Sequence, residues 1–222
     1  AHSFVRTKED LLEIQEILDA ERSHLKIISK IENQQGIDNL EEILTYCYGV
    51  MIARGDLGVE IPAERIPLIQ KQIVQKCRAR KKPVIVATQM LHSMIENPRP
   101  TRAEVTDVAN AIFQSTDAIM LSGETASGKY PVEAVKIMSS IAMEAEKTID
   151  TTLDLNLEKV TKPIAAVLAR SLVAATMTLP VKALIFDTWT GRTGRYLAEF
   201  RPKVPIYAMC YNIITFVVRR LL

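Results

Sequence analysis

The chain has 222 residues, of which 48% are hydrophobic, 24% are charged and 5% are aromatic. This composition is typical of a globular protein with a large core and one or two domains, and it excludes disordered and fibrous proteins. The 28 basic and 26 acidic residues nearly balance, and no polybasic block occurs, so we expect no nucleic-acid partner.

Short apolar runs alternate with longer stretches of helical periodicity through the first 148 residues, which is the pattern of βα units. We predict five such units, the first of which is a strand stub at residues 3–5 and a helix starting at residue 7. Four more strands are expected at residues 25–31, 50–53, 84–88 and 118–121. Their helices are predicted at residues 38–46, at residues 64–80, from residue 101 and from residue 131.

Three of these helix starts carry a capping-box pattern, in which an acid follows the N-cap residue by three positions. The pairs are Thr7 with Asp10, Asp38 with Glu41, and Thr101 with Glu104. The RGDLG segment at residues 54–58 and the longer segment at residues 89–100 are predicted as loops.

Five βα units could form a doubly wound sheet or part of a closed TIM (β/α)8 barrel, and spacing alone does not separate the two. Unusual polar residues follow the second, third, fourth and fifth strands, all at their carboxyl ends. Barrel enzymes build their sites there, whereas a doubly wound sheet concentrates such residues at one switch point. The sequence therefore favours an α/β fold in which residues 1–148 form a partial barrel.

From residue 149 to residue 161 the pattern lapses into polar, turn-rich sequence, which predicts a boundary between domains 1–148 and 149–222. The second domain is again predicted as α/β. Its elements are a helix at residues 163–178, a strand at 183–187, a helix ending near residue 200 and a strand at 205–209. Because the chain stops in an apolar and basic run at residues 219–222, we expect this domain to be incomplete.

The three cysteines, Cys47, Cys77 and Cys210, stand far apart without a CxxC pair, which argues against a zinc site or a disulfide framework. No apolar run approaches the ~20 residues that span a bilayer, and the N-terminus lacks a signal-peptide pattern. We expect a cytoplasmic protein without a membrane partner.

One lysine and two acids are the strongest chemical signal in the chain. The period of two along a strand puts Lys30 and Glu32 on one face, and Asp56 follows the next strand. Two carboxylates with water and substrate oxygens can hold Mg²⁺, and a buried lysine needs an anionic partner. This pattern indicates metal-assisted chemistry on an anionic substrate, although a structural Lys30–Glu32 ion pair and an ordinary helix-capping acid are alternatives.

The residues after the third and fourth strands could contact a substrate. Gly55 and Gly58 allow close approach of the backbone, and amides at a helix start bind carboxylate or phosphate. Thr88 has a hydroxyl that could relay a proton through water, although threonine at a strand end also reflects β-propensity.

Other polar residues could support this site or form a second one. Arg54, Ser122 and Glu124 are candidates for supporting hydrogen bonds, although the last two could simply cap the next helix. In the second domain, the segment Thr190, Gly191, Arg192 and Thr193 precedes a helix and could cradle a phosphate, or could be an ordinary glycine turn.

The segments KIISKIEN, MIARGDLGVEIP, PVIVATQML and DAIMLSGETASGKYPVEAV, in this order and spacing, resemble the pyruvate kinase family. The resemblance covers residues 1–148 almost continuously and the remainder less firmly. It implies a TIM barrel, entered at its fourth strand and represented by about its last five βα units, followed by part of a C-terminal α/β domain.

The resemblance also implies roles for single residues. Lys30 would stabilise the enolate and the transferring phosphoryl group, and Glu32 and Asp56 would bind Mg²⁺ or Mn²⁺. The amides of Gly55 and Asp56 would hold the carboxylate of phosphoenolpyruvate, and Thr88 would help to deliver a proton. The implied reaction, assisted by K⁺, converts phosphoenolpyruvate and ADP to pyruvate and ATP in glycolysis.

Residues Thr188 to Thr193 resemble the family's effector-binding phosphate loop, with Thr190 where serine is common, and imply a sugar-phosphate effector. A homotetramer is implied by the resemblance alone. The first three barrel strands, which carry the family's phosphate-binding arginine and K⁺ ligands, and the small lid domain have no counterpart in this sequence. We therefore expect the parent protein to be the enzyme and this chain alone to be inactive.

Two other functions remain open from the sequence. One is a lyase or aldolase of the wider phosphoenolpyruvate and pyruvate barrel group, which also forms a metal-bound enolate. The other is a non-catalytic fragment that binds an effector and takes part in assembly. Phosphate transfer to ADP would distinguish a kinase from the lyase or aldolase. Ligand binding without turnover would support the non-catalytic fragment.

Overall fold

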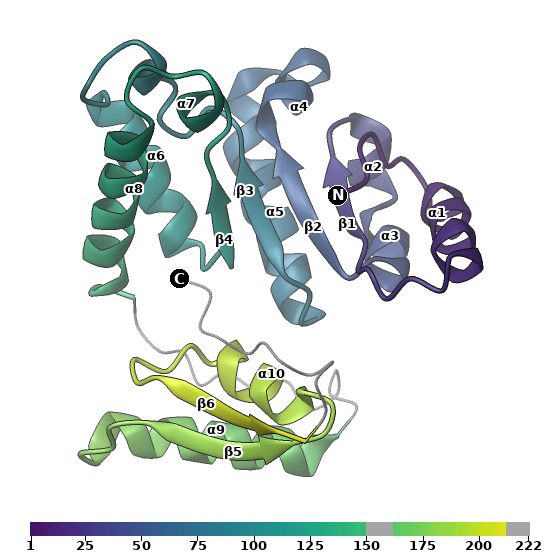
Figure 1. The fold of residues 1–222 in the computed structure, drawn as a ribbon, viewed down its shortest axis with the longest axis vertical. Coiled ribbons are helices and arrows are strands. Elements are labelled where there is room, and N and C mark those ends of the chain that lie inside the picture. Colours follow the sequence, from purple (N-terminus) through teal and green to yellow (C-terminus); the bar gives the residue numbers. More distant parts are fainter. Residues whose placement is uncertain (150–161, 212–222) are drawn as a thin grey trace. The chain divides into compact units, whose positions relative to one another are not determined.

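A computed structural model describes residues 1–149 and 162–211 of the chain, which divides into two compact units, Ala1–Thr148 and Ile149–Leu222. Each unit has its own parallel sheet (Figure 1). Each unit also has its own hydrophobic core.

The first unit is built on four parallel strands in the order β1-β2-β3-β4. Their bounds are β1 Ile28–Ile31, β2 Gly49–Ala53, β3 Val84–Ala87 and β4 Ala118–Met120. The strand stub predicted at residues 3–5 is represented by one residue, because His2 makes an isolated parallel bridge to Ser29 and Phe4 turns to a φ of 53°. All four strands run in one direction, so their carboxyl ends lie along the same edge of the sheet (Figure 1).

Helices follow each strand of this unit. The α-helices are α1 Lys8–Ala20, α2 Gln34–Asp38, α3 Leu40–Tyr46, α4 Arg54–Glu60, α5 Ile66–Ala79, α6 Arg102–Phe113, α7 Gly123–Ala126 and α8 Pro131–Glu146. Two 3-10 turns, η1 Ala63–Arg65 and η2 His92–Ile95, lie in the connections. β2 and β3 are nearly continuous apolar runs. Val50, Ile52, Val84 and Val86 share one face of the sheet and are fully buried, whereas Met51 and Ile85 on the other face are only partly buried.

Two of the three predicted capping boxes form. Asp10 accepts the N–H of Thr7 at 3.0 Å, and Thr101 and Glu104 bond each other's backbone N–H groups at 3.2 and 2.7 Å. The box predicted at Asp38 is wrong, because Asp38 ends α2 and α3 starts only at Leu40. The local cap is Asn33 instead, whose side chain accepts the N–H of Gly36 at 2.8 Å.

The RGDLG segment, predicted as a loop, is the helix α4. Arg54 and Leu57 lie three positions apart, and both are buried by the fold. Glycine inside a helix costs about 1 kcal/mol relative to alanine, which is why the two glycines suggested a loop. Burial of one helical face outweighs this local preference.

The second unit contains helix α9 Pro163–Thr178, strand β5 Leu184–Thr188, helix α10 Arg192–Glu199 and strand β6 Ile206–Cys210. The strands pair in parallel, with Leu184 opposite Ile206. The predicted helix at 163–178 has the observed bounds, and each predicted strand is shifted by one residue. The turn-rich segment at 150–161 and the terminal apolar and basic run lie outside the described residues.

The three cysteines are free thiols. Cys47 and Cys77 are buried, and burial raises the pKa of Cys77 to about 12, which keeps that thiol protonated at neutral pH. In the described part of the chain, no helix combines the length and the apolar character that crossing a membrane requires.

The capping box of α6 yields a stability prediction. Glu104 also accepts hydrogen bonds from the N–H of Ser93 at 2.6 Å and from its hydroxyl at 2.5 Å. Burial raises the pKa of Glu104, but the hydrogen bonds from Ser93 and Thr101 together outweigh it and lower that pKa below its ordinary value. The Glu104→Ala change should reduce the free energy of unfolding at neutral pH by about 1–2 kcal/mol.

Because the folded-state pKa is lowered, the contribution of Glu104 is complete above the ordinary glutamate pKa of about 4.3 and is lost as the pH falls through the lower folded value. Urea unfolding at several pH values should therefore show the difference between wild type and variant shrinking in acid. Glu133→Ala, which removes an exposed acid from the first turn of α8, is the control and should change stability much less. An equal effect of the two substitutions would contradict this role for Glu104.

Candidate active site

The carboxyl edge of the four-stranded sheet collects the predicted site residues. Glu32 directly follows β1, Arg54 directly follows β2, and Thr88 directly follows β3. The register keeps these ends level, since Ile31 lies opposite Ile52 and Ala53 lies opposite Ala87. Segments far apart in the sequence thus present their polar residues along one edge.

Lys30 and Glu32 form an ion pair at this edge, with Lys30 Nζ 2.7 Å from Glu32 Oε1. The Glu32 side chain is fully buried, whereas the Lys30 side chain is 24% exposed. Glu32 Oε1 has no hydrogen-bond partner of suitable geometry among the described residues, so the lysine charge is its compensation. The ion pair anticipated as a structural alternative is therefore present, and part of the Lys30 side chain remains exposed.

Two neighbours of this pair were missed by sequence reasoning. Ser3 Oγ accepts a hydrogen bond from Lys30 Nζ at 2.9 Å, and the N–H of Phe4 donates to Glu32 Oε2 at 2.6 Å. The parallel bridge between His2 and Ser29 puts Ser3 beside Lys30. From the sequence, Ser3 and Phe4 are predicted only as part of the strand stub at residues 3–5.

The start of α4 contacts Thr88 directly. The N–H of Gly55 donates to Thr88 Oγ1 at 2.7 Å, and that hydroxyl donates to the carbonyl oxygen of Ala87 at 2.6 Å. Asp56, in the first turn of α4, is exposed, and its side chain makes no hydrogen bond or ion pair with another described residue. A Cβ on Gly58 would meet no described atom within 4 Å, so packing inside the described part of the chain does not require glycine there, and close approach to a ligand stays a prediction.

Thr88 leaves the strand with an unusual backbone. Its φ is 68°, and the φ of Gln89 is 53°, so β3 ends at Ala87 rather than at Thr88 as predicted. Positive φ is rare for a β-branched residue, and holding a residue there costs on the order of 1–3 kcal/mol. Other contacts must therefore hold Thr88 in this conformation.

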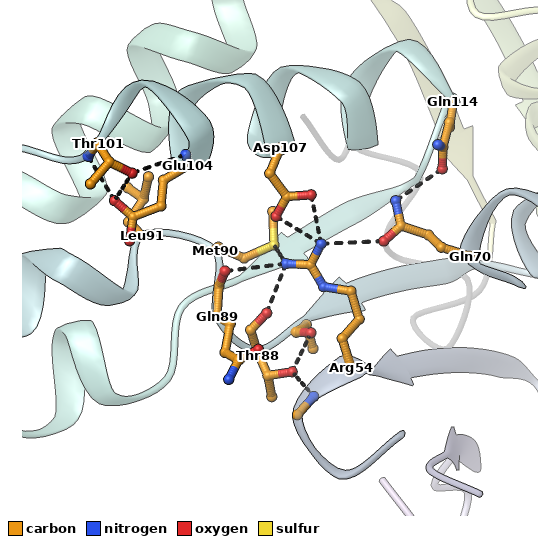
Figure 2. Close-up of polar contacts among 12 residues, drawn as sticks. Arg54, Gln70, Thr88, Gln89, Met90, Leu91, Thr101, Glu104, Asp107 and Gln114 are labelled. Carbon is orange, nitrogen blue, oxygen red and sulfur yellow. Dashed lines mark hydrogen bonds and ion pairs between the residues drawn. The ribbon is translucent and has the colours of Figure 1, made fainter. Parts of the chain in front are cut away.

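Arg54 supplies several contacts in this region (Figure 2). Its Nη1 lies 2.7 Å from Asp107 Oδ2 on α6, and its Nη2 donates to the carbonyl oxygen of Thr88 at 2.8 Å. Gln70 on α5 accepts a longer bond from Nη1 at 3.4 Å and donates to Gln114 at 2.9 Å. The sequence suggested Arg54 as a supporting residue but gave none of its partners. Gln70 carried a signal, as a polar residue within the buried stripe of α5.

Glu124 joins the loops that follow β3 and β4. It is 2% exposed, and its two carboxylate oxygens accept the N–H of Leu91 at 3.1 Å and the N–H of Ser122 at 2.8 Å. The Ser122 side chain makes no cap bond to α7. Glu124 thus hydrogen-bonds both loops, the Ser122 hydroxyl does not cap α7, and the role of both residues in supporting the site stays a prediction.

The acidic residues that could bind a metal are Glu32 and Asp56. No group of three or more potential ligands from His, Cys, Asp and Glu gathers within the described ranges. Mg²⁺ is commonly held by one or two carboxylates, with water and substrate oxygens completing the shell. Glu32 and Asp56 supply carboxylate oxygens of this kind: Asp56 is exposed, and the Glu32 oxygen that lacks a hydrogen bond lies 2.7 Å from Lys30 Nζ.

The glycine turn before α10 is closed by Thr188. Its Oγ1 accepts the N–H of Gly191 at 2.9 Å, and Gly191 takes a φ of 71°, a left-handed conformation that glycine adopts without strain. Thr190, Arg192 and Thr193 are exposed around this turn. Beside it, Trp189 is 70% exposed and stacks on Tyr211, with 5.2 Å between the ring centroids.

Sequence comparison gives two matches to family models. The model described as "Pyruvate kinase, barrel domain" matches residues 1–135, and "Pyruvate kinase, alpha/beta domain" matches residues 166–221. Over 209 residues the chain is 55% identical to a pyruvate kinase of Borreliella burgdorferi, covering 93% of this chain and 44% of that protein. Over 215 residues it is 51% identical to a pyruvate kinase of Bacillus licheniformis, covering 96% of this chain and 37% of that protein.

Structural comparison agrees. A crystal structure of a pyruvate kinase from Cryptosporidium parvum superposes with a TM-score of 0.87 and 42% identity, covering 95% of this chain and 45% of that one. The chain thus spans less than half the length of these relatives. The predicted fold class, a partial TIM barrel followed by part of an α/β domain, is confirmed. This chain belongs to the pyruvate kinase family.

Proposed function

We propose that the complete protein containing this chain is a pyruvate kinase, which transfers the phosphoryl group of phosphoenolpyruvate to ADP and releases pyruvate and ATP in glycolysis. The observation that carries this proposal is the Lys30–Glu32 pair at the carboxyl edge of the sheet, within a chain of this family. Barrel enzymes build their sites at that edge.

Lys30 is the residue we assign to charge stabilisation. Its ammonium is oriented by Glu32 at 2.7 Å and by the Ser3 hydroxyl at 2.9 Å, while part of the side chain remains exposed. A positive group held in place before the reaction stabilises charge that develops on the enolate and phosphoryl oxygens, because little reorganisation is then required.

Glu32 and Asp56 are the residues we assign to a divalent metal ion, Mg²⁺ or Mn²⁺. Such an ion, when bound, polarises phosphoryl and enolate oxygens. K⁺ also belongs to this proposal, although no residue of this chain is assigned to it.

Thr88 is the residue we assign to proton delivery. A water molecule gives a proton to the methylene carbon of enolpyruvate, the electron pair of the C=C bond forms the new C–H bond, and the enolate oxygen becomes the ketone oxygen. The Thr88 hydroxyl then gives a proton to the hydroxide that this water leaves, and recovers one from solvent.

The Gly55 amide serves Thr88 in the structure, so binding a substrate carboxylate there requires the threonine hydroxyl to turn away. Asp56 is the third residue of α4, and its N–H belongs to the first turn, where amides have no intrahelical partner. These two amides form the proposed carboxylate contact, with Arg54, Ser122 and Glu124 as supporting residues.

Further assignments complete the proposal. A sugar-phosphate effector would bind at Thr188, Thr190, Gly191, Arg192 and Thr193. The hydrogen bond from Gly191 to Thr188 closes this turn before α10, and the side chains of Thr190, Arg192 and Thr193 are exposed. We also propose a homotetramer in the cytoplasm.

The first test measures the intact mass of the purified protein and its turnover of phosphoenolpyruvate and ADP, coupled to lactate dehydrogenase, with Mg²⁺ and K⁺ present. We expect turnover from a protein about twice as long as this chain, as in its relatives, and none from the 24.9 kDa chain alone. Turnover by the isolated chain would contradict the second expectation. A complete protein that binds sugar phosphate without turnover would instead support a binding module.

The Lys30→Met change in the complete protein should lower kcat by about 100- to 1,000-fold, because it removes one preorganised charge. The KM for phosphoenolpyruvate should change much less. Lys26→Met is the matched control, since Lys26 is exposed in the same segment before β1, and it should leave both constants unchanged. If the two variants turn over equally, Lys30 has no role in the reaction.

The Glu32→Gln change should weaken Mn²⁺ binding by on the order of 10- to 100-fold, because it removes a proposed carboxylate ligand. Mn²⁺ affinity can be measured by water-proton relaxation, independently of turnover. Glu64→Gln, at an exposed acid beyond α4, should leave the affinity unchanged. Wild-type affinity in the Glu32 variant would place the metal elsewhere.

A further inference from the structure

Resting on the proposed role of Thr88, we infer that Arg54 is a positioning residue that holds Thr88 in its left-handed conformation. The guanidinium bonds the Thr88 carbonyl, and the next residue, Gly55, bonds the Thr88 hydroxyl. Two consecutive residues of α4 thus hold the carbonyl oxygen and the hydroxyl of the same threonine.

The backbone of Thr88 requires such support. With φ values of 68° and 53° at Thr88 and Gln89, two successive residues without glycine's freedom occupy the left-handed region. Arg54 Nη2 reaches the carbonyl oxygens of both, at 2.8 Å and 3.4 Å. A rotation of this segment back to an extended conformation would turn these carbonyls away from the guanidinium.

Arg54 is itself held in place by two helices. It is 9% exposed, and a buried guanidinium needs a countercharge, which Asp107 on α6 supplies through both carboxylate oxygens at 2.8 and 2.7 Å. Gln70 on α5 approaches the same Nη1, and its amide is fixed in turn by Gln114. The guanidinium therefore links α5 and α6 to the end of β3.

A lysine in place of Arg54 would not reproduce this arrangement. The planar guanidinium directs Nη1 to Asp107 and Nη2 to the Thr88 carbonyl, whereas an ammonium is a single point charge. Arg54→Lys would keep a charge near Asp107 and lose the bond that fixes the threonine backbone. Charge and positioning can thus be separated experimentally.

The test compares Arg54→Lys, Arg54→Met and Asp107→Asn in the complete protein. One readout is exchange of the pyruvate methyl protons with deuterium from D₂O, followed by NMR with Mg²⁺ and K⁺ present, which isolates the proton-transfer step. The second is hydrogen exchange of the Gly55 amide, which is bonded to Thr88 and needs no turnover. Asp107→Asn keeps the shape of the side chain and is the milder variant if the arginine variants fold poorly.

We expect methyl-proton exchange to slow by on the order of 10- to 100-fold in both arginine variants, the scale of a small misplacement of a reacting group. The KM for phosphoenolpyruvate should change less than the exchange rate, and the Gly55 amide should exchange faster while amides of β2 keep their protection. Asp107→Asn should shift both readouts in the same direction by a smaller factor. Arg80→Met is the matched control, because Arg80 pairs with Glu41 on the exposed surface of the same unit, and it should change neither readout.

The inference is overturned if Arg54→Lys keeps wild-type methyl-proton exchange and wild-type protection at Gly55. It is also overturned if the arginine variants lose thermal stability while the ratio of methyl-proton exchange to phosphoryl transfer stays constant, since that describes a purely structural residue. Failure of the proposed function looks different, because the wild-type protein itself would then catalyse neither methyl-proton exchange nor phosphoryl transfer.

Discussion

Parallel pairing of four short strands is the constraint on which the site depends. Each strand contributes only three to five residues to the sheet, and the face that carries Val50, Ile52, Val84 and Val86 is fully buried. The level register puts the carboxyl ends of all four strands at one edge, and polar residues lie at or directly after those ends. The Lys30–Glu32 pair and the Thr88 segment lie close to that edge for this reason.

Contacts made over long sequence distances override local preference at this edge. Two glycines lie within a helix because Arg54 and Leu57 are buried, and a threonine takes a positive φ because its carbonyl and hydroxyl are bonded from α4. Both features break a rule of local sequence, and both occur beside the proposed catalytic groups. Proteins tolerate strain where surrounding contacts over-determine the conformation.

The sequence predicts strand faces and helix caps, which follow from local patterns. It does not predict contacts between residues that lie far apart along the chain. A period of two is enough to place Lys30 and Glu32 on one face, and capping patterns are enough for the starts of α1 and α6. The partner of Arg54 lies 53 residues away on another helix, and the amide that bonds Glu32 lies 28 residues before it. No local pattern specifies such contacts, so Asp107, Ser3 and Phe4 emerge only from the folded chain.

The sequence contains a single tryptophan, and it stacks on Tyr211 immediately before the turn at Gly191. Intrinsic tryptophan fluorescence therefore comes entirely from the second unit, whatever happens at the barrel edge. Ligand contact at this turn would alter the packing or solvation of the largely exposed Trp189 indole. Its fluorescence would therefore report on this turn without an added label. The first unit has no tryptophan signal of its own, so events at its edge must be followed by other means.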